Sequence, residues 1–142
     1  MVRRGRARPV DRLSAGKYRQ VGRAFLDAAD ALSAVADDDE TYGNAIALLS
    51  IHAAIAYSDA MSIAYGERKS TAGDHEQAVS VLRGVLAARL PSDMDSLLLS
   101  LVRAKDGVAY QGKYYPLQDG RALLERATKF ARWADQLYQQ RP

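Results

Sequence analysis

The residues best suited to chemistry gather within one short stretch, where Arg103, Lys105 and Asp106 follow one another closely. The planar guanidinium of an arginine can bind two phosphate oxygens at once and stays charged at physiological pH. Asp106 stands three positions after Arg103, a spacing that brings two side chains together on a helix, so its carboxylate can orient the guanidinium. The stretch indicates a phosphate-binding pair of cations, with a solvated helix face as the open alternative.

Three tyrosines, Tyr110, Tyr114 and Tyr115, come directly after this stretch. Their rings could stack on nucleobases, or they could anchor a helix end while the hydroxyl groups stay in water. As a general base, tyrosine is poorly suited, because a phenol ordinarily titrates near pH ~10.

A second polar pair, His52 and Asp59, lies in an otherwise apolar stretch. Its seven-residue spacing is close to two helical turns, so both side chains share a helix face. A buried carboxylate needs a partner, and Arg103 or Lys105 is the expected one. The histidine fits either a polar interface or a core position bonded to a backbone carbonyl. His75 stands between two acids that cannot converge with it on one ion, so we expect a helix start there and no metal site.

The composition is that of a single soluble domain. The chain has 142 residues and no cysteine, which excludes disulfides and thiolate chemistry and fits a reducing cytoplasm. The formal charge is +3, but residues 1–10 hold four arginines and no acid, so the remaining 132 residues sum to −1. We therefore expect a basic, flexible tail over residues 1–12 and one domain over residues 13–140. No membrane span is expected, because Asp59 interrupts the longest apolar stretch, residues 45–64.

Apolar residues recur at helical spacing in five segments, and no segment is typical of a strand. The helices are expected over about residues 14–35, 39–65, 74–90, 92 to between 105 and 110, and 117–139. The second is apolar on two faces, which favours a place in the middle of a bundle, and Gly66 is suited to end it. Short loops favour antiparallel neighbours. The sequence thus predicts an all-α, antiparallel four- or five-helix bundle without a sheet. The outer face of the last helix mixes Arg121, Glu125, Arg126, Lys129, Arg132 and Asp135.

Three stretches in this order carry a family likeness: IHAAIAYSDAMSIAYG in the second helix, GDHEQAVSVL at the third, and LLSLVRAKDGVAYQGKYYPLQDGRALLERATKFARWADQL from residue 98 onward. From about residue 15, the pattern resembles the HEPN superfamily, named for higher eukaryotes and prokaryotes nucleotide-binding. The resemblance implies a helical bundle that usually dimerises and, in many members, a metal-independent ribonuclease. The family signature is an arginine, four to six residues and a histidine near the dimer axis.

In this chain the arginine of that signature would be Arg103, and after six residues Tyr110 takes the place of the histidine. Because a tyrosine is a weaker base at neutral pH than a histidine, the resemblance implies a phosphate-binding groove more directly than it implies a nuclease.

We therefore expect a cytoplasmic, homodimeric module without a cofactor that binds RNA or a nucleotide and cleaves RNA weakly or not at all. Its faces for dimerisation would lie on the second and fourth helices. The resemblance further suggests a partner such as an antitoxin or a nucleotidyltransferase in a bacterial defence pair. Two alternatives stay open, a ribonuclease toxin that uses Arg103 and Tyr110, and a structural bundle that docks a helical partner. The expected binding residues are Arg103, Lys105, Asp106, Tyr114 and Asp59.

Overall fold

The computed structural model describes residues 7–37, 41–71, 76–109 and 114–142. These ranges contain five α-helices, so the prediction of an all-α bundle is confirmed at that level. The helices are α1 (Ala15–Val35), α2 (Tyr42–Gly66), α3 (Glu76–Leu86), α4 (Ser92–Ala109) and α5 (Leu117–Gln139). Two 3-10 turns, η2 (Arg12–Ser14) and η3 (Ala87–Arg89), precede α1 and follow α3.

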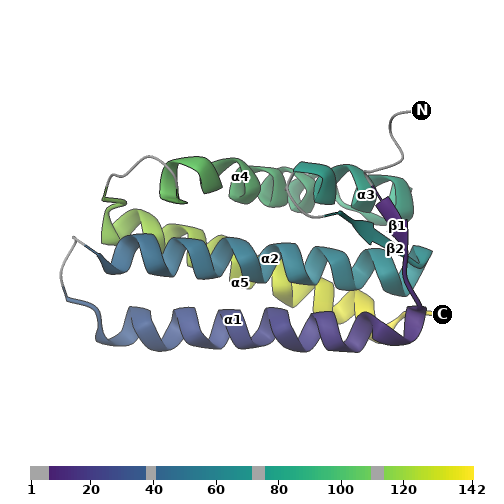
Figure 1. Ribbon diagram of the computed structural model, residues 1–142, viewed down its shortest axis with the longest axis horizontal. Helices are drawn as coiled ribbons and strands as arrows, with labels where there is room; N and C mark the ends of the chain where they lie inside the picture. Colours follow the sequence, from purple (N-terminus) through teal and green to yellow (C-terminus); the bar gives the residue numbers. More distant parts are fainter. Residues whose placement is uncertain (1–6, 38–40, 72–75, 110–113) are drawn as a thin grey trace.

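Helix α2 is the centre of the bundle and contacts each of the other four helices. Figure 1 shows α2 running between α1 and α4, in front of α5. Alanines such as Ala53, Ala54 and Ala60 are almost fully buried on it, and their small side chains let neighbouring helices approach closely. In the described part of the chain, only α2 is long and apolar enough to cross a membrane, and 78% of its most apolar window is buried. Such burial is consistent with the core helix of a soluble protein.

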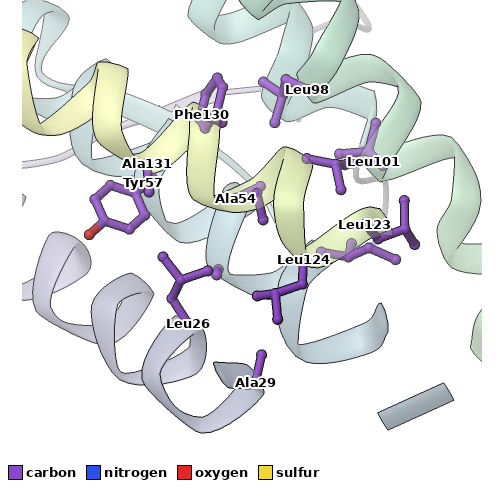
Figure 2. Packing of buried hydrophobic residues seen from close by; sticks show 14 of the residues in the cluster. Leu26, Ala29, Ala54, Tyr57, Leu98, Leu101, Leu123, Leu124, Phe130 and Ala131 are labelled. Atoms are coloured by element: carbon purple, nitrogen blue, oxygen red, sulfur yellow. The ribbon is translucent and has the colours of Figure 1, made fainter. Parts of the chain in front are cut away.

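The core is built where the apolar stripes of four helices meet. Leu26 of α1, Tyr57 of α2, Leu98 of α4 and Phe130 of α5 all belong to this one buried cluster (Figure 2). Full burial of one large apolar side chain stabilises a fold by about 1.5–3 kcal/mol. The helical spacing places these side chains on one face of each helix, and their burial is what stabilises the bundle.

Two short strands, β1 (Ala7–Pro9) and β2 (Arg68–Ser70), form an antiparallel pair with Ala7 opposite Ser70 and Pro9 opposite Arg68. The backbone amide of Val10 extends this contact by donating to the carbonyl of Glu67 at 2.9 Å. The prediction of a bundle without a sheet was thus wrong at this point, because three residues are too few to show the alternation that marks a strand. Residues 1–6 of the expected tail lie outside the described residues.

The position of β2 also determines the direction in which α3 runs relative to α2. Val85, near the end of α3, packs against Gly66 at the end of α2, so α2 and α3 run in the same direction. The expectation of antiparallel neighbours was wrong for this pair, because β2 runs back along α2 and brings Ser70 to Asp59 (Figure 1).

The side chain of Asn44 joins the start of α2 to helix α4 and to the segment that precedes α5. Its amide nitrogen donates to the carbonyl of Val108 in α4 at 2.9 Å, and its oxygen accepts from the amide of Tyr115 at 2.8 Å. Gly43 and Gly120 allow this approach, since a Cβ at Gly43 would collide with the backbone of Tyr115 and one at Gly120 with the carbonyl of Gly43. Asn44 therefore fixes both sides of the connection between α4 and α5.

Candidate functional site

Arg103 lies on an exposed part of α4, facing α3. Its Nε is 3.6 Å from the Oε2 of Glu76, and it lines a shallow groove of about 310 Å³ between the two helices. Across that groove, Arg83 donates to both carboxylate oxygens of Asp95 at 3.0 Å. Because each arginine faces an acid, the groove carries little excess positive charge. The ion pair of Arg103 is with Glu76 on another helix, whereas the sequence suggested Asp106.

Lys105 does not share a surface with Arg103. The residue Lys105 as a whole is buried, with 7% of its area exposed, whereas the side chain of Arg103 is 62% exposed. Residues two positions apart on a helix point in nearly opposite directions. Arg103 and Lys105 therefore do not form the expected basic pair at the surface of α4.

Asp59 bonds to the strand pair and not to α4. Its Oδ1 accepts a hydrogen bond of 3.0 Å from the hydroxyl of Ser70, and Lys69 and Arg8 are the cations that act on it. Burial raises the pKa of Asp59, and the charge of Lys69 and the bonds from Ser70 offset part of that rise. Arg103 and Lys105 were the wrong partners to expect, because this end of α2 is covered by β2.

The other residues singled out from the sequence are spread over the molecule. Tyr114 is exposed and Tyr115 is half-buried, and burial raises the pKa of Tyr115. The ring of His52 packs against Phe25 of α1, with centroids 5.7 Å apart. Tyr110 and His75 lie outside the described residues. No group of three His, Cys, Asp or Glu side chains in the described ranges could hold a metal ion.

A basic hollow lies over α5, where the sequence predicted only a charged outer face. It is a groove of about 930 Å³ whose walls include Asp30 and Ser33 of α1 and Leu97 of α4. Two acids, Asp30 and Glu125, line it together with a larger number of cations, so positive charge predominates. Those cations are Arg121, Arg126, Lys129 and Arg132.

One of these cations has a structural role. Arg121 donates to the hydroxyl of Ser33 at 3.0 Å, to the carbonyl of Ser33 at 2.6 Å and to the carbonyl of Ala36 at 3.0 Å. These carbonyls end α1, where a cation also interacts favourably with the helix dipole. The cations that remain for a ligand are Arg126, Lys129 and Arg132, which follow at three-residue intervals over about 9 Å of the helix axis.

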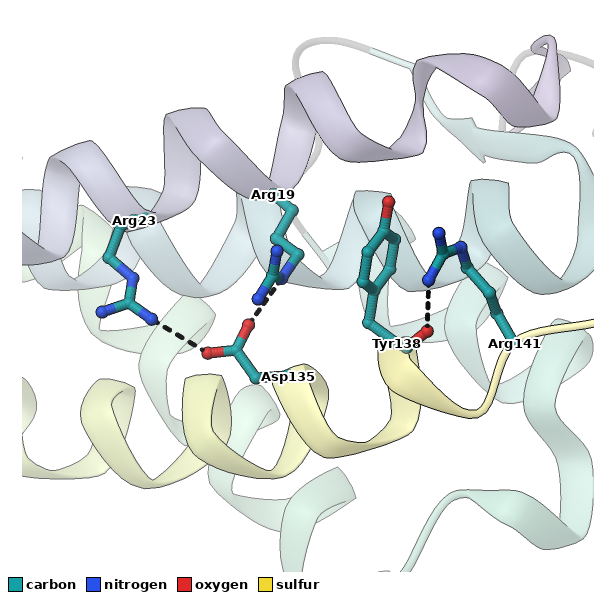
Figure 3. Close-up of polar contacts among 5 residues, drawn as sticks. All are labelled: Arg19, Arg23, Asp135, Tyr138 and Arg141. Atoms are coloured by element: carbon teal, nitrogen blue, oxygen red, sulfur yellow. Dashed lines mark hydrogen bonds and ion pairs between the residues drawn. The ribbon is translucent and has the colours of Figure 1, made fainter.

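A second group of cations, near the end of α5, ties that helix to α1. Figure 3 shows Asp135 between Arg19 and Arg23, at 2.7 and 3.2 Å, and Tyr138 beside Arg141. The guanidinium groups of Arg19 and Arg141 lie 4.8 and 3.9 Å from the centre of the Tyr138 ring. These partners are already satisfied within the protein, so we assign the cluster to the packing of α1 on α5.

No protein-family model, curated protein or solved structure matches this chain. The described fold places the chain in the class of five-helix bundles with a small strand pair at one end. The likeness to the HEPN superfamily rests on the three sequence stretches alone.

Proposed function

We propose that this protein is a HEPN-like module that binds RNA or nucleotide phosphates, and that the groove over α5 is its binding surface. The observation that supports this proposal is the excess of cations in that groove. Arg126, Lys129 and Arg132 line it besides the helix-capping Arg121, against two acids. A row of cations on a rigid helix can contact successive phosphates of a nucleic-acid backbone.

The groove over α5 suits an anion better than the groove at Arg103 does. A phosphate at Arg103 would have to displace or approach the carboxylate of Glu76, and Arg83 is held by Asp95. An exposed ion pair such as Arg103 with Glu76 contributes only about 0–1 kcal/mol. Arg103 can therefore add a secondary contact, but it does not supply the main positive surface.

Binding is expected without rapid cleavage. Metal-independent cleavage of RNA needs a base for the 2′-hydroxyl proton and an acid for the leaving oxygen. In the motif that this chain resembles, Tyr110 stands where the base would be, and a neutral phenol is a slow base at pH 7.

The proposal is tested by reversing two charges in the groove, in the variant Arg126→Glu/Lys129→Glu. Fluorescence anisotropy with a labelled single-stranded RNA should show at least a tenfold loss of affinity. The slope of log affinity against log salt should fall by about 1.4, since each lost phosphate contact on a single strand removes about 0.7. Arg121 is left in place because its loss would disturb the end of α1.

The matched control is Lys17→Glu/Arg68→Glu, which changes the net charge equally at two exposed positions. Lys17 precedes Asp30 of the groove by about 20 Å along α1. Affinity should change less than threefold in this control. Equal losses in both double variants, or RNA binding that does not depend on salt, would refute the groove as the binding surface.

A cleavage assay in EDTA separates this proposal from the ribonuclease. Intact RNA after incubation with the purified protein is the expected result. Rapid cleavage that disappears in both Arg103→Ala and Tyr110→Phe would establish the catalytic alternative instead.

A further inference from the structure

A second hollow, of about 450 Å³, lies farther along α5 toward its C-terminal end. It combines two aromatic rings, one at the end of α2 and one on α5, with a guanidinium from η3 and an amide side chain. The residues that line it are Tyr65, Arg89, Trp133, Leu137, Gln140 and Pro142. The pocket therefore offers flat apolar surfaces, a cation and a hydrogen-bonding edge in one place.

Contacts within the protein hold these side chains in position. The hydroxyl of Tyr65 donates to the backbone carbonyl of Leu137 at 2.7 Å, and the guanidinium of Arg89 lies 5.4 Å from the centre of the Tyr65 ring. Trp133 is half-buried and packs against Phe130, with ring centres 5.4 Å apart. A ligand would meet rings that are already ordered, which lowers the entropy lost on binding.

The pocket lies on the same side of α5 as part of the basic groove. Trp133 follows Lys129 by four residues and Arg126 by seven, and both spacings return to nearly the same helix face. Along the axis, Lys129 is about 6 Å and Arg126 about 10 Å from Trp133. A strand whose phosphates contact these two cations could therefore place a neighbouring base at Trp133.

We propose that this pocket takes one unpaired nucleobase of a single-stranded nucleic acid whose phosphates lie along Lys129 and Arg126. The inference rests on the proposed function of the groove and adds the class of ligand. Aromatic rings and arginine planes stack on exposed bases, and the amide of Gln140 can donate to and accept from a base edge. Bases within a duplex are paired and stacked, so the pocket discriminates against double strands.

Trp133 is the only tryptophan of the chain, so its fluorescence reports on this pocket directly. The full chain is titrated with a short oligouridylate, the matching oligodeoxynucleotide, an RNA duplex and inorganic polyphosphate. Single strands should quench the fluorescence strongly, whereas the duplex and polyphosphate should bind the groove with little quenching. A difference between the ribose and deoxyribose strands would identify which of the two the site prefers.

The variant Trp133→Leu should lower affinity for the oligouridylate about tenfold, as expected for the loss of one stacked base, and for polyphosphate less than twofold. Trp133→Phe keeps a ring and should retain part of the affinity that Trp133→Leu loses. Arg126→Glu/Lys129→Glu should weaken the binding of both the oligouridylate and polyphosphate.

Two outcomes are distinguished by this design. Polyphosphate binding with no response of Trp133 to any single strand overturns the base pocket and leaves the proposed function standing. A wild-type protein that binds neither polyphosphate nor oligonucleotide overturns both. Because the titrations use the wild-type chain, they test the base pocket at Trp133 even where a variant folds poorly.

Discussion

At the scale of single residues, Asp59 is a carboxyl group in the most buried helix of the molecule. Burial raises its pKa above the ordinary value of 3.8, although Lys69 and Ser70 act in the opposite direction. The folded state therefore holds this proton more tightly than the unfolded chain does. The contribution of Asp59 to stability is accordingly most favourable below the ordinary pKa and declines as the pH rises through the folded-state pKa.

The variant Asp59→Asn removes this ionisation and keeps an oxygen that can accept from the Ser70 hydroxyl. We expect a Tm above that of the wild type at pH ~7 and a flatter dependence of Tm on pH across the acid range. Thermal unfolding followed by circular dichroism measures both. The control Asp106→Asn, at an exposed position on α4, should leave the profile unchanged. A lower Tm for Asp59→Asn at neutral pH would mean that the attraction to Lys69 outweighs burial.

Among the helices, the end of α2 has two neighbouring residues, Gly66 and Glu67, with different structural roles. Gly66 was expected to end the helix, but it is the last helical residue, and Glu67 takes the left-handed conformation with φ of 54°. A Cβ at Gly66 would lie 2.7 Å from a methyl group of Val85. Gly66 is therefore required for the close approach of α3 to α2. The strained positive φ is adopted by the next residue, Glu67, which carries a side chain.

Glu67→Gly should stabilise the protein by about 1 kcal/mol, because glycine adopts a positive φ without the steric cost of a Cβ. The ion pair lost with Arg12 spans 3.7 Å between exposed side chains and contributes little to stability.

Gly66→Ala should cost about 1–3 kcal/mol through overpacking, and Val85→Ala in the same chain should recover part of this loss of stability. Urea unfolding measures all three. Stabilisation by Gly66→Ala would contradict the assigned packing role.

At the scale of the whole molecule, α3 is too short to cover α2. Helix α3 has 11 residues and α2 has 25. In the N-terminal and middle part of α2, Leu48 and Ile55 stay half-buried, as does His52, whose ring also contacts Phe25 of α1. Their spacing places them on one face, and such a stripe is suited to pairing with a second copy by two-fold symmetry.

We therefore predict a homodimer in which α2 contributes to the interface. Light scattering at micromolar concentration should give twice the chain mass of 15.5 kDa. Leu48→Glu should shift the protein to the monomer, whereas Leu13→Glu, at a position that is 90% exposed in η2, should not. A wild-type protein of 15.5 kDa under these conditions would exclude the dimer.

Local patterns in the sequence were enough to predict the five helices and the central place of α2. Both follow from local periodicity, because apolar residues at helical spacing define an amphipathic helix, and two such stripes define a helix covered on more than one side. The excess of basic residues near the start of the chain and the charged outer face of α5 were equally visible. The substitution of Tyr110 for histidine in the motif was visible too, and its consequence for cleavage stays a prediction.

Which of these residues contact one another depends on how the helices pack in three dimensions. Asp59 bonds to Ser70 through a strand pair that periodicity does not reveal, and Arg121 caps helix α1 at its C-cap residue Ala36, which lies 85 residues earlier in the chain. Trp133 shares a pocket with Tyr65 and Arg89 because three elements end at the same place. Such contacts depend on how helices pack and where each ends, and local spacing carries no information about side chains brought together from distant parts of the chain.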